Sequence, residues 1–231
     1  MKKAQILPLF LQNGFLSLKF KFPDDLLLPG ETDTYWSHYD CDIVIRYYDG
    51  ADDNKEDLVV GNFSAYHYHT EMATMDGYCD YDGFNTYDTD NFDQYSGIIW
   101  NHDTRELSKE FVKATGCDFL SGDFFILMSI NIFPEYRGYD LGNAVTWLFY
   151  RNFCRHSDIL MLLAYPLQFG LTSEEQNKCK PGEFTGSQQE CTKRLANYYK
   201  KLGFRRIGRS DFYFFLCEYT MKRPDILDHI G

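Results

Sequence analysis

The middle of the chain holds the feature that most constrains its fold, a long apolar run that a proline ends and a helix follows. Residues 124–133 are almost all apolar, which is typical of a strand buried on both faces. Pro134 ends the run, and apolar residues then recur at helical spacing from Leu141 to about residue 155. Residues 159–165 are a second apolar run of strand length. This order of strand, helix and strand predicts an α/β unit.

The C-terminal part of the chain continues the same alternation. Residues 166–188 carry no periodic pattern, so we expect an irregular connection. Residues 189–202 predict a helix that Gly203 ends. Residues 204–217 predict strand, with a hairpin turn near residues 209–211. The second half therefore reads β-α-β-α-β.

The N-terminal half is predicted to supply further strands. Residues 16–22 alternate apolar and polar side chains, as a half-buried strand does. Residues 42–48 and 58–69 predict two more strands, which we expect to pair as a hairpin. Between them and the apolar run, residues 70–95 are polar and rich in Gly and Asp, so we expect a long loop. Residues 103–114 predict a short helix that Asp103 or Thr104 caps and Gly116 ends.

Composition excludes several classes of function. The chain has 231 residues and a formal net charge of −11, which argues against binding to nucleic acid or to an anionic membrane surface. No segment approaches the roughly 18 apolar residues of a membrane span. The N-terminal apolar stretch is interrupted by Pro8, Gln12 and Asn13, so we expect no signal peptide.

The cysteines indicate the redox compartment. There are seven, an odd number, and no two stand in a C-x-x-C pair. The cysteines indicate neither a disulfide framework nor a zinc site. Reduced thiols in a cytoplasmic protein fit this pattern best.

The turn after Pro134 is the strongest candidate for a binding site. The first N–H groups of a helix have no partner within the helix and carry partial positive charge. They form a ready site for a phosphate or pyrophosphate. Gly138 and Gly142 flank the expected helix start near Asp140, and a glycine lets the backbone approach a ligand closely.

The segment from Ile132 to Gly142 resembles the acetyl-CoA signature of the GNAT superfamily of N-acetyltransferases. That signature is Arg/Gln-x-x-Gly-x-Gly/Ala, placed after a hydrophobic strand and a proline. Arg137 stands at its first position and Gly142 at its last. Asp140 replaces the middle glycine, which puts a carboxylate near the expected pyrophosphate.

A second segment, about 60 residues further on, strengthens the resemblance. Residues 198–204 read Tyr-Tyr-Lys-Lys-Leu-Gly-Phe, similar to the segment that ends the family's last helix. The order and the spacing of the two motifs both match. The resemblance covers residues 124–217, extends loosely to the strands within residues 42–69, and leaves out residues 70–95.

The resemblance implies one domain over residues 1–231, with irregular insertions at about residues 70–100 and 166–188. It implies an α/β fold with a mixed, mostly antiparallel sheet flanked by helices, and a V-shaped splay between two central strands. Acetyl-CoA would enter that splay as co-substrate, and its acetyl group would pass directly to a primary amine. The residues that it assigns to acetyl-CoA are Ile130, Ile132, Arg137, Gly138, Tyr139, Asp140, Leu141, Gly142 and Asn143.

The catalytic role that the resemblance assigns is the general acid, Tyr199, which would protonate the departing thiolate. Tyr198 lies about 100° away around the helix, so we expect it to be a control for Tyr199. The family's CoA-binding asparagine, seven residues before the tyrosine, is replaced by Thr192.

The general base stays open, and so do the acceptor and the oligomeric state. The candidates for the base are His67, Asp123, or a water held by Ser129 or Asn131. The substitutions at Asp140 and at residue 192, with the missing base, leave a second reading, a catalytically silent acyl-CoA-binding or interaction module. A third is an acyltransferase that uses another acyl donor or modifies a protein. Under each reading the protein could form a homodimer.

A metal site is the weaker alternative. His67 and His69 should share one face of a strand, with Glu71 following, as some metal sites require. Exposed strand histidines are more common, so we expect no metal. Residues 80–83 resemble a calcium loop, but their glycine is two positions early.

Overall fold

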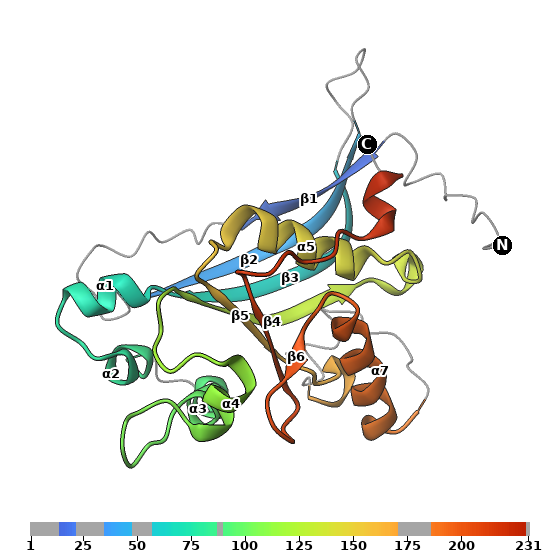
Figure 1. The fold of residues 1–231 in the computed structure, drawn as a ribbon. Coiled ribbons are helices and arrows are strands. Elements are labelled where there is room, and N and C mark those ends of the chain that lie inside the picture. Colours follow the sequence, from blue (N-terminus) through green and yellow to red (C-terminus); the bar gives the residue numbers. More distant parts are fainter. Residues whose placement is uncertain (1–13, 22–34, 48–56, 87–89, 171–185, 230–231) are drawn as a thin grey trace.

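The computed structural model describes residues 14–21, 35–47, 57–86, 90–170 and 186–229. One mixed sheet of seven strands runs through this part of the chain, in the order β1-β2-β3-β4-β5-β7-β6. Only β4 and β5 pair in parallel. The strands are β1 (Gly14–Phe20), β2 (Trp36–Tyr47), β3 (Leu58–Tyr68), β4 (Phe124–Ile132), β5 (Ile159–Leu163), β6 (Arg205–Arg206) and β7 (Phe212–Leu216) (Figure 1).

Six α-helices accompany the sheet in the described residues, so the expected α/β fold class is confirmed. None of these helices is long and apolar enough to cross a membrane. The six described cysteines are free thiols. The helices are α1 (Thr70–Met75), α2 (Asp80–Phe84), α3 (Asp90–Ile99), α4 (Lys109–Thr115), α5 (Leu141–Phe153) and α7 (Gln188–Lys200), with short 3-10 turns at Pro134–Tyr136, Leu167–Phe169 and Asp225–Asp228.

Two hydrophobic clusters hold the helices to the sheet. Strand side chains alternate between the clusters: in β5, Leu160 and Leu162 face the cluster that contains residues of α5 and α7. Ile159 and Met161 face the cluster that contains residues of α1 to α4. The apolar runs of β4 and β5 thus bury side chains in both directions, as the sequence predicted.

The prediction of a long loop over residues 70–95 was wrong. The segment forms α1, α2 and the start of α3, and short turns join α1 to α2 and follow α2. Its helices have five to ten residues, and helices of that length rely on tertiary contacts. Here aromatic rings supply them: Trp36 packs edge-on against Phe84 and Phe92 at centroid distances of 4.9 and 4.6 Å.

Other strands and helices begin or end at residues different from those predicted. β2 begins at Trp36, six residues before the predicted start, because the polar residues before Asp42 pair with β3. The expected hairpin of β2 and β3 is confirmed. The helix predicted from residue 103 begins only at Lys109, since Ser108 caps it by accepting from the Phe111 N–H. Residues 22 and 48, predicted as strand ends, and most of residues 166–188 lie outside the described part of the chain.

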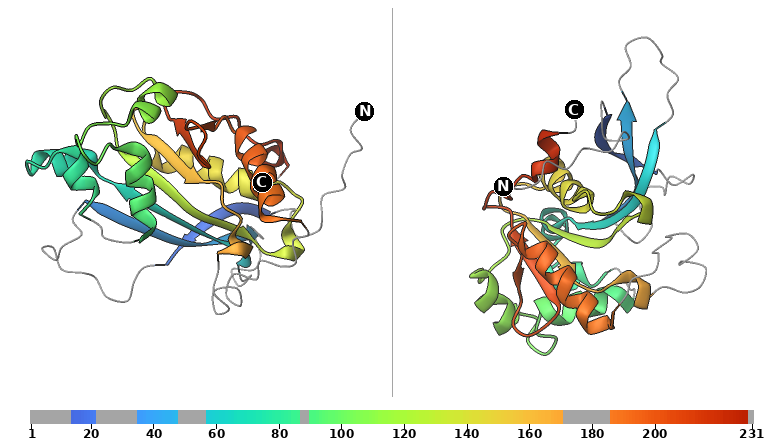
Figure 2. Two further views of the ribbon diagram at one scale, coloured as in Figure 1. Left: turned by 90° about the horizontal axis from the view of Figure 1, so that it is seen from below. Right: turned by 90° about the vertical axis from the view of Figure 1, so that its right-hand side faces the viewer.

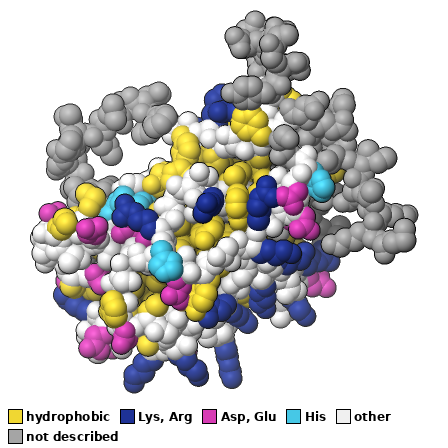
Figure 3. All heavy atoms as spheres, turned by 45° about the horizontal axis from the view of Figure 1, so that its top comes forward, with side chains coloured by type: hydrophobic (Ala, Val, Ile, Leu, Met, Phe, Trp, Pro, Cys, Tyr) yellow, Lys and Arg dark blue, Asp and Glu magenta, His cyan; other side chains and the backbone are white. Residues whose placement is uncertain are grey.

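The described surface is mixed in character. In the view of Figure 3, hydrophobic side chains form a central band that Lys and Arg side chains border. This face is therefore not uniformly acidic, although the net charge of the chain is −11.

Candidate functional site

A cavity of about 480 Å³ opens beside β4. Residues 127–132 of β4 form one wall, and Leu163 with residues 165–167 forms another. The start of α5 and one face of α7 complete the lining. In the right-hand view of Figure 2, α5 lies above β4 and α7 below it.

The cavity exists because β4 and β5 separate. Their parallel pairing runs from Phe124↔Ile159 only to Leu127↔Leu162, while β4 continues to Ile132. At the point of separation Met128 is an extra residue in the pairing with β3, since Ser64 pairs with Ser129 and Ala65 with Leu127. A bulge of this kind bends a strand and increases its twist. The parallel ladder therefore ends at Leu127 and Leu162, and the cavity lies beyond its end.

The separation of β4 and β5 leaves one edge of β4 without a strand partner among the described residues. Phe133, which directly follows β4, donates its N–H to the carbonyl of Val60 in β3. Backbone groups of a strand point alternately to its two sides, so Ile130 and Ile132 direct theirs away from β3 and toward the cavity. An edge of this kind can hydrogen-bond an extended ligand as an added strand would.

The opposite edge, on β5, is satisfied by a side chain. The hydroxyl of Tyr95 in α3 accepts the N–H of Leu163 at 3.1 Å. The N–H of the next residue, Ala164, donates to the carbonyl of Asp211, which directly precedes β7. The N–H of Leu163 therefore points to the opposite side of β5, where β4 no longer pairs with it. Tyr95 was not singled out from the sequence, because it lay at the end of a predicted loop.

The loop before α5 holds an unusual backbone. Gly138 has φ +88° and Asp140 has φ +62°, a region that residues other than glycine rarely adopt, although Asp tolerates it better than most. The Arg137 side chain turns back, and its Nε donates to the Ile132 carbonyl at 2.7 Å. The arginine at the first signature position therefore ties the loop to the open edge of β4.

Asp140 is the N-cap residue of α5, but its side chain caps no backbone N–H. Instead it accepts from the Asn143 side chain at 2.6 Å. Partial burial raises the pKa of Asp140 above its ordinary value, and the hydrogen bond from Asn143 and the charge of Lys201 oppose this rise.

One face of α7 closes the cavity. Its five lining residues follow helical spacing, i, i+3, i+4, i+7 and i+8. Tyr199 is among them, and no hydrogen bond joins its hydroxyl to another described residue. Burial raises the pKa of Tyr199 far above its ordinary value, so the phenol keeps its proton at neutral pH. The five residues are Cys191, Arg194, Leu195, Tyr198 and Tyr199.

Tyr198 was expected to be a control outside the site, and this expectation was wrong. It lines the same cavity as Tyr199, because positions i+7 and i+8 both belong to the lining face. Its hydroxyl lies against Gly142 in the first turn of α5. Burial and the charge of Asp140 raise the pKa of Tyr198 far above its ordinary value, and the nearby backbone N–H of Asn143 only partly offsets this rise.

The cavity gathers most of the residues that the sequence singled out. Tyr139 packs at the edge of the hydrophobic cluster that contains α5, and Asn143 is buried with 2% of its surface exposed. Neither lines the cavity, and neither does Thr192. The predicted residues that do line it are Ile130, Ile132, Arg137, Gly138, Asp140, Leu141, Gly142 and Tyr199.

The charges in the lining favour an anion. Arg137 and Arg194 are its described cations, and Asp140 is its one described carboxylate. Arg194 was not singled out from the sequence. Its position four residues before Tyr198, on the same face of α7, was the signal that could have found it.

The candidate bases divide into two groups. Ser129 and Asn131 line the cavity, where either could hold a water. His67 and Asp123 do not line it, and they bond to each other at 2.8 Å near the start of β4. A water positioned by Ser129 or Asn131 is therefore the candidate that the cavity itself offers.

Comparisons of the chain with protein families, with curated proteins and with solved structures find no match.

Proposed function

We propose that this chain is an acetyl-CoA-dependent N-acyltransferase of the GNAT type, which transfers an acetyl group to a primary amine. The observation that carries the proposal is the meeting of three parts in one cavity: the open edge of β4, the start of α5 and the buried phenol of Tyr199. The sequence resemblance names the same three parts. Each suits a different part of an acyl-CoA molecule.

The start of α5 suits the pyrophosphate. Its unpaired N–H groups and helix dipole attract anions, and Arg137 and Arg194 add positive charge nearby. The edge of β4 at Ile130 and Ile132 suits the amide groups of the pantetheine arm. An extended chain with amide groups can pair there as a strand does.

The chemistry then needs a proton donor near the sulfur. In the proposed reaction the amine nitrogen attacks the thioester carbon, the C–N bond forms and the C–S bond breaks. The amine loses a proton to a water at Ser129 or Asn131, and the thiolate gains one from Tyr199. The N–H of Ile132 would stabilise the oxyanion that forms on the carbonyl oxygen.

A second candidate, a catalytically silent acyl-CoA-binding module, has its own support. Asp140 places negative charge at the start of α5, and the hydroxyl of Tyr198 lies against Gly142 there. Among the described lining residues no His or Glu stands as a base. These features weaken catalysis and anion binding alike.

An acetyl-transfer assay separates the two candidates. The full chain is incubated with acetyl-CoA and a panel of polyamines, aminoglycosides and peptides with free amino groups. Free thiol release and mass spectrometry of the acceptors report transfer. The enzyme proposal predicts at least one acceptor that gains an acetyl group above the rate without protein. Binding of CoA by calorimetry with no transfer to any acceptor favours the silent module, and absence of both rejects the two candidates together.

A further inference from the structure

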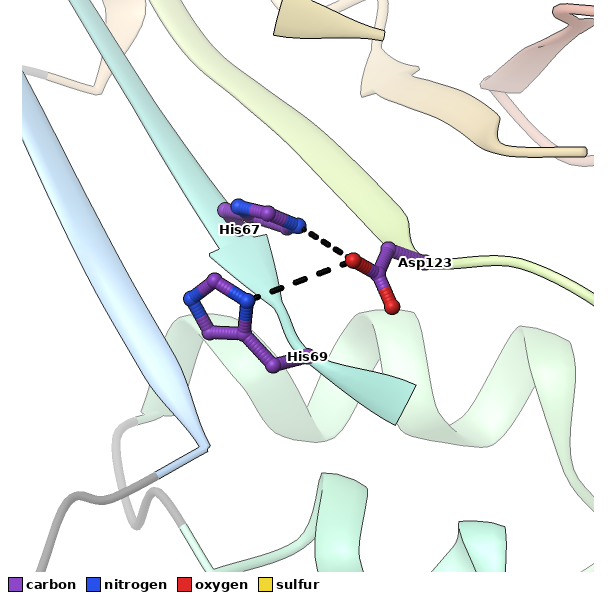
Figure 4. A group of neighbouring side chains, drawn as sticks. All are labelled: His67, His69 and Asp123. Atoms are coloured by element: carbon purple, nitrogen blue, oxygen red, sulfur yellow. Dashed lines mark hydrogen bonds and ion pairs between the residues drawn. The ribbon is translucent and has the colours of Figure 1, made fainter. Parts of the chain in front are cut away.

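Three side chains outside the cavity converge on one point. His67 Nε2 lies 2.8 Å from Asp123 Oδ2, and His69 Nδ1 lies 4.0 Å from the same oxygen (Figure 4). All three ligand atoms lie within 4.8 Å of one another. We propose that His67, His69 and Asp123 bind one divalent transition-metal ion, with Zn²⁺ the best fit. This site does not rest on the proposed acyltransferase function.

The backbone places the three groups together without any special loop. His67 lies in β3 and His69 directly follows it, and alternate residues of a strand share one face. Asp123 directly precedes β4, whose first residue Phe124 pairs with Tyr68. The two strands therefore deliver both imidazoles and the carboxylate to the same end of the sheet. The imidazole rings stand 3.8 Å apart between centroids.

The outer nitrogen of each imidazole is already held. His67 Nδ1 lies 3.3 Å from the Tyr39 hydroxyl, and His69 Nε2 lies 2.8 Å from the Ser37 hydroxyl. Both hydroxyls come from β2. Metal-binding histidines nearly always bond their other ring nitrogen to a second partner, which fixes the ring. Here that arrangement turns both inner nitrogens toward Asp123.

The carboxylate is fixed in the same way. Asp123 Oδ1 accepts the N–H of Thr70 at 2.9 Å, which leaves Oδ2 toward the imidazoles. The backbone N–H of Asp123 donates to Asp158 Oδ1 at 3.0 Å. Asp158 adds a second negative charge near the site. Arg155 is the opposing charge, since it is close enough to act on the pKa of His69.

The distances and the ligand types suit zinc. Zn²⁺ binds imidazole nitrogen and carboxylate oxygen at roughly 2.0–2.2 Å, so tetrahedral ligands stand about 3.3 Å apart. The present separations of 2.8 and 4.0 Å bracket that value. The side chains of His67 and Asp123 are 12% exposed and that of His69 is 24% exposed. Solvent therefore reaches the group, and water can complete the coordination of a three-ligand site.

The competing explanation is a hydrogen-bonded pair that only joins β3 to β4. It accounts for the contact of His67 with Asp123. It does not account for His69, whose Nδ1 faces the same oxygen at 4.0 Å, beyond hydrogen-bond distance. From the sequence, exposed histidines were expected, with Glu71 as the third ligand. In the structure both imidazole rings are partly buried, Glu71 is exposed, and the third group beside the histidines is Asp123.

The test is calorimetric titration of ZnCl₂ into the untagged full chain, stripped with a chelator and kept reduced with a phosphine. We expect one Zn²⁺ bound per chain. Asp123→Asn keeps an oxygen for the Thr70 N–H but loses the charge, and it should weaken binding at least about tenfold. His69→Gln should do the same. His38→Gln is the control, because His38 also bonds a hydroxyl, that of Ser64, on the same sheet.

Three outcomes overturn the proposal: no stoichiometric binding, unchanged affinity in folded Asp123→Asn and His69→Gln, or an equal loss in His38→Gln. Circular dichroism checks the fold of each variant. If a variant does not fold, Co²⁺ bound to the wild type decides. Visible absorption without a thiolate charge-transfer band, together with shifts of two histidines in NMR spectra, supports the site. A thiolate band assigns the metal to cysteine instead and rejects it.

Discussion

The hydroxyl of Tyr198 lies against Gly142 at the start of α5: a β-carbon added to that glycine would stand 2.6 Å from the hydroxyl oxygen. The same hydroxyl is close enough to the backbone N–H of Asn143 for that group to act on its pKa. A residue of α7 thus occupies part of the helix end that we propose for the pyrophosphate. Binding of acetyl-CoA must therefore either displace the phenol or use it.

The first prediction concerns that competition. Tyr198→Phe removes the hydroxyl from the start of α5 and leaves room for a phosphate oxygen to accept the N–H groups there. A hydrogen bond is worth about 1 kcal/mol, so calorimetry should show acetyl-CoA binding about fivefold tighter. Tyr150→Phe is the control. Tyr150 lies in α5, far from its start, and its hydroxyl donates to the Tyr219 carbonyl. Weaker binding in Tyr198→Phe would mean that the phenol donates to the phosphate.

The second prediction concerns the general acid. Tyr199→Phe keeps the ring and its packing but removes the proton. General acid catalysis contributes about 10²–10⁴-fold, and water can partly replace the phenol, so kcat should fall about 100-fold. Affinity for CoA should change less than about twofold. Equal turnover in wild type and Tyr199→Phe would remove Tyr199 from the mechanism.

The third prediction concerns pH. Burial already raises the pKa of Asp140, and a bound pyrophosphate should raise it further, because the anion favours the protonated, neutral carboxyl. Asp140→Asn keeps an acceptor for Asn143 and should bind acetyl-CoA about fivefold tighter at pH 8 and low salt. As the pH falls and Asp140 takes up its proton, this advantage should shrink. An advantage that stays constant down to the lowest pH at which both proteins remain folded would show that the charge of Asp140 does not act on the ligand.

The fourth prediction concerns the separation of β4 and β5. Tyr95→Phe removes the hydroxyl that accepts the Leu163 N–H. The bond is part-buried, so urea denaturation should show a loss of about 1 kcal/mol, the typical net contribution of a hydrogen bond. In the control, Tyr81→Phe, an exposed bond to His102 is lost, and stability should barely change. Equal losses in the two variants would contradict the role given to Tyr95.

How far the sequence predicted the fold depended on periodicity. The apolar runs of β4 and β5 and the helix between them gave strong signals, and their elements lie within a few residues of the predicted bounds. The short helices between residues 70 and 99 gave none. They are stabilised by contacts with Trp36 and Tyr68 on distant strands, and no local pattern reports such contacts.

The site divided in the same way. The signature residues from Arg137 to Gly142 follow one another along the chain, so a motif could find them. Tyr95 contacts Leu163 through tertiary packing, and Arg194 lines the cavity from one face of α7. The group of His67, His69 and Asp123 joins residues 56 positions apart. The histidine spacing was visible in the sequence, but the carboxylate between them was not.

The most direct test of the account is whether acetyl-CoA binds at the start of α5. Titration calorimetry would compare the wild type with Gly142→Glu, which adds bulk and negative charge at the proposed pyrophosphate site. Gly97→Glu makes the same change on the exposed side of α3, where the added carbon would meet only His102 at 3.6 Å. We predict one acetyl-CoA bound per chain in the wild type and in Gly97→Glu, and at least about 100-fold weaker binding, about 2.7 kcal/mol, in Gly142→Glu. No binding by the wild type, or unchanged affinity in folded Gly142→Glu, would contradict the account.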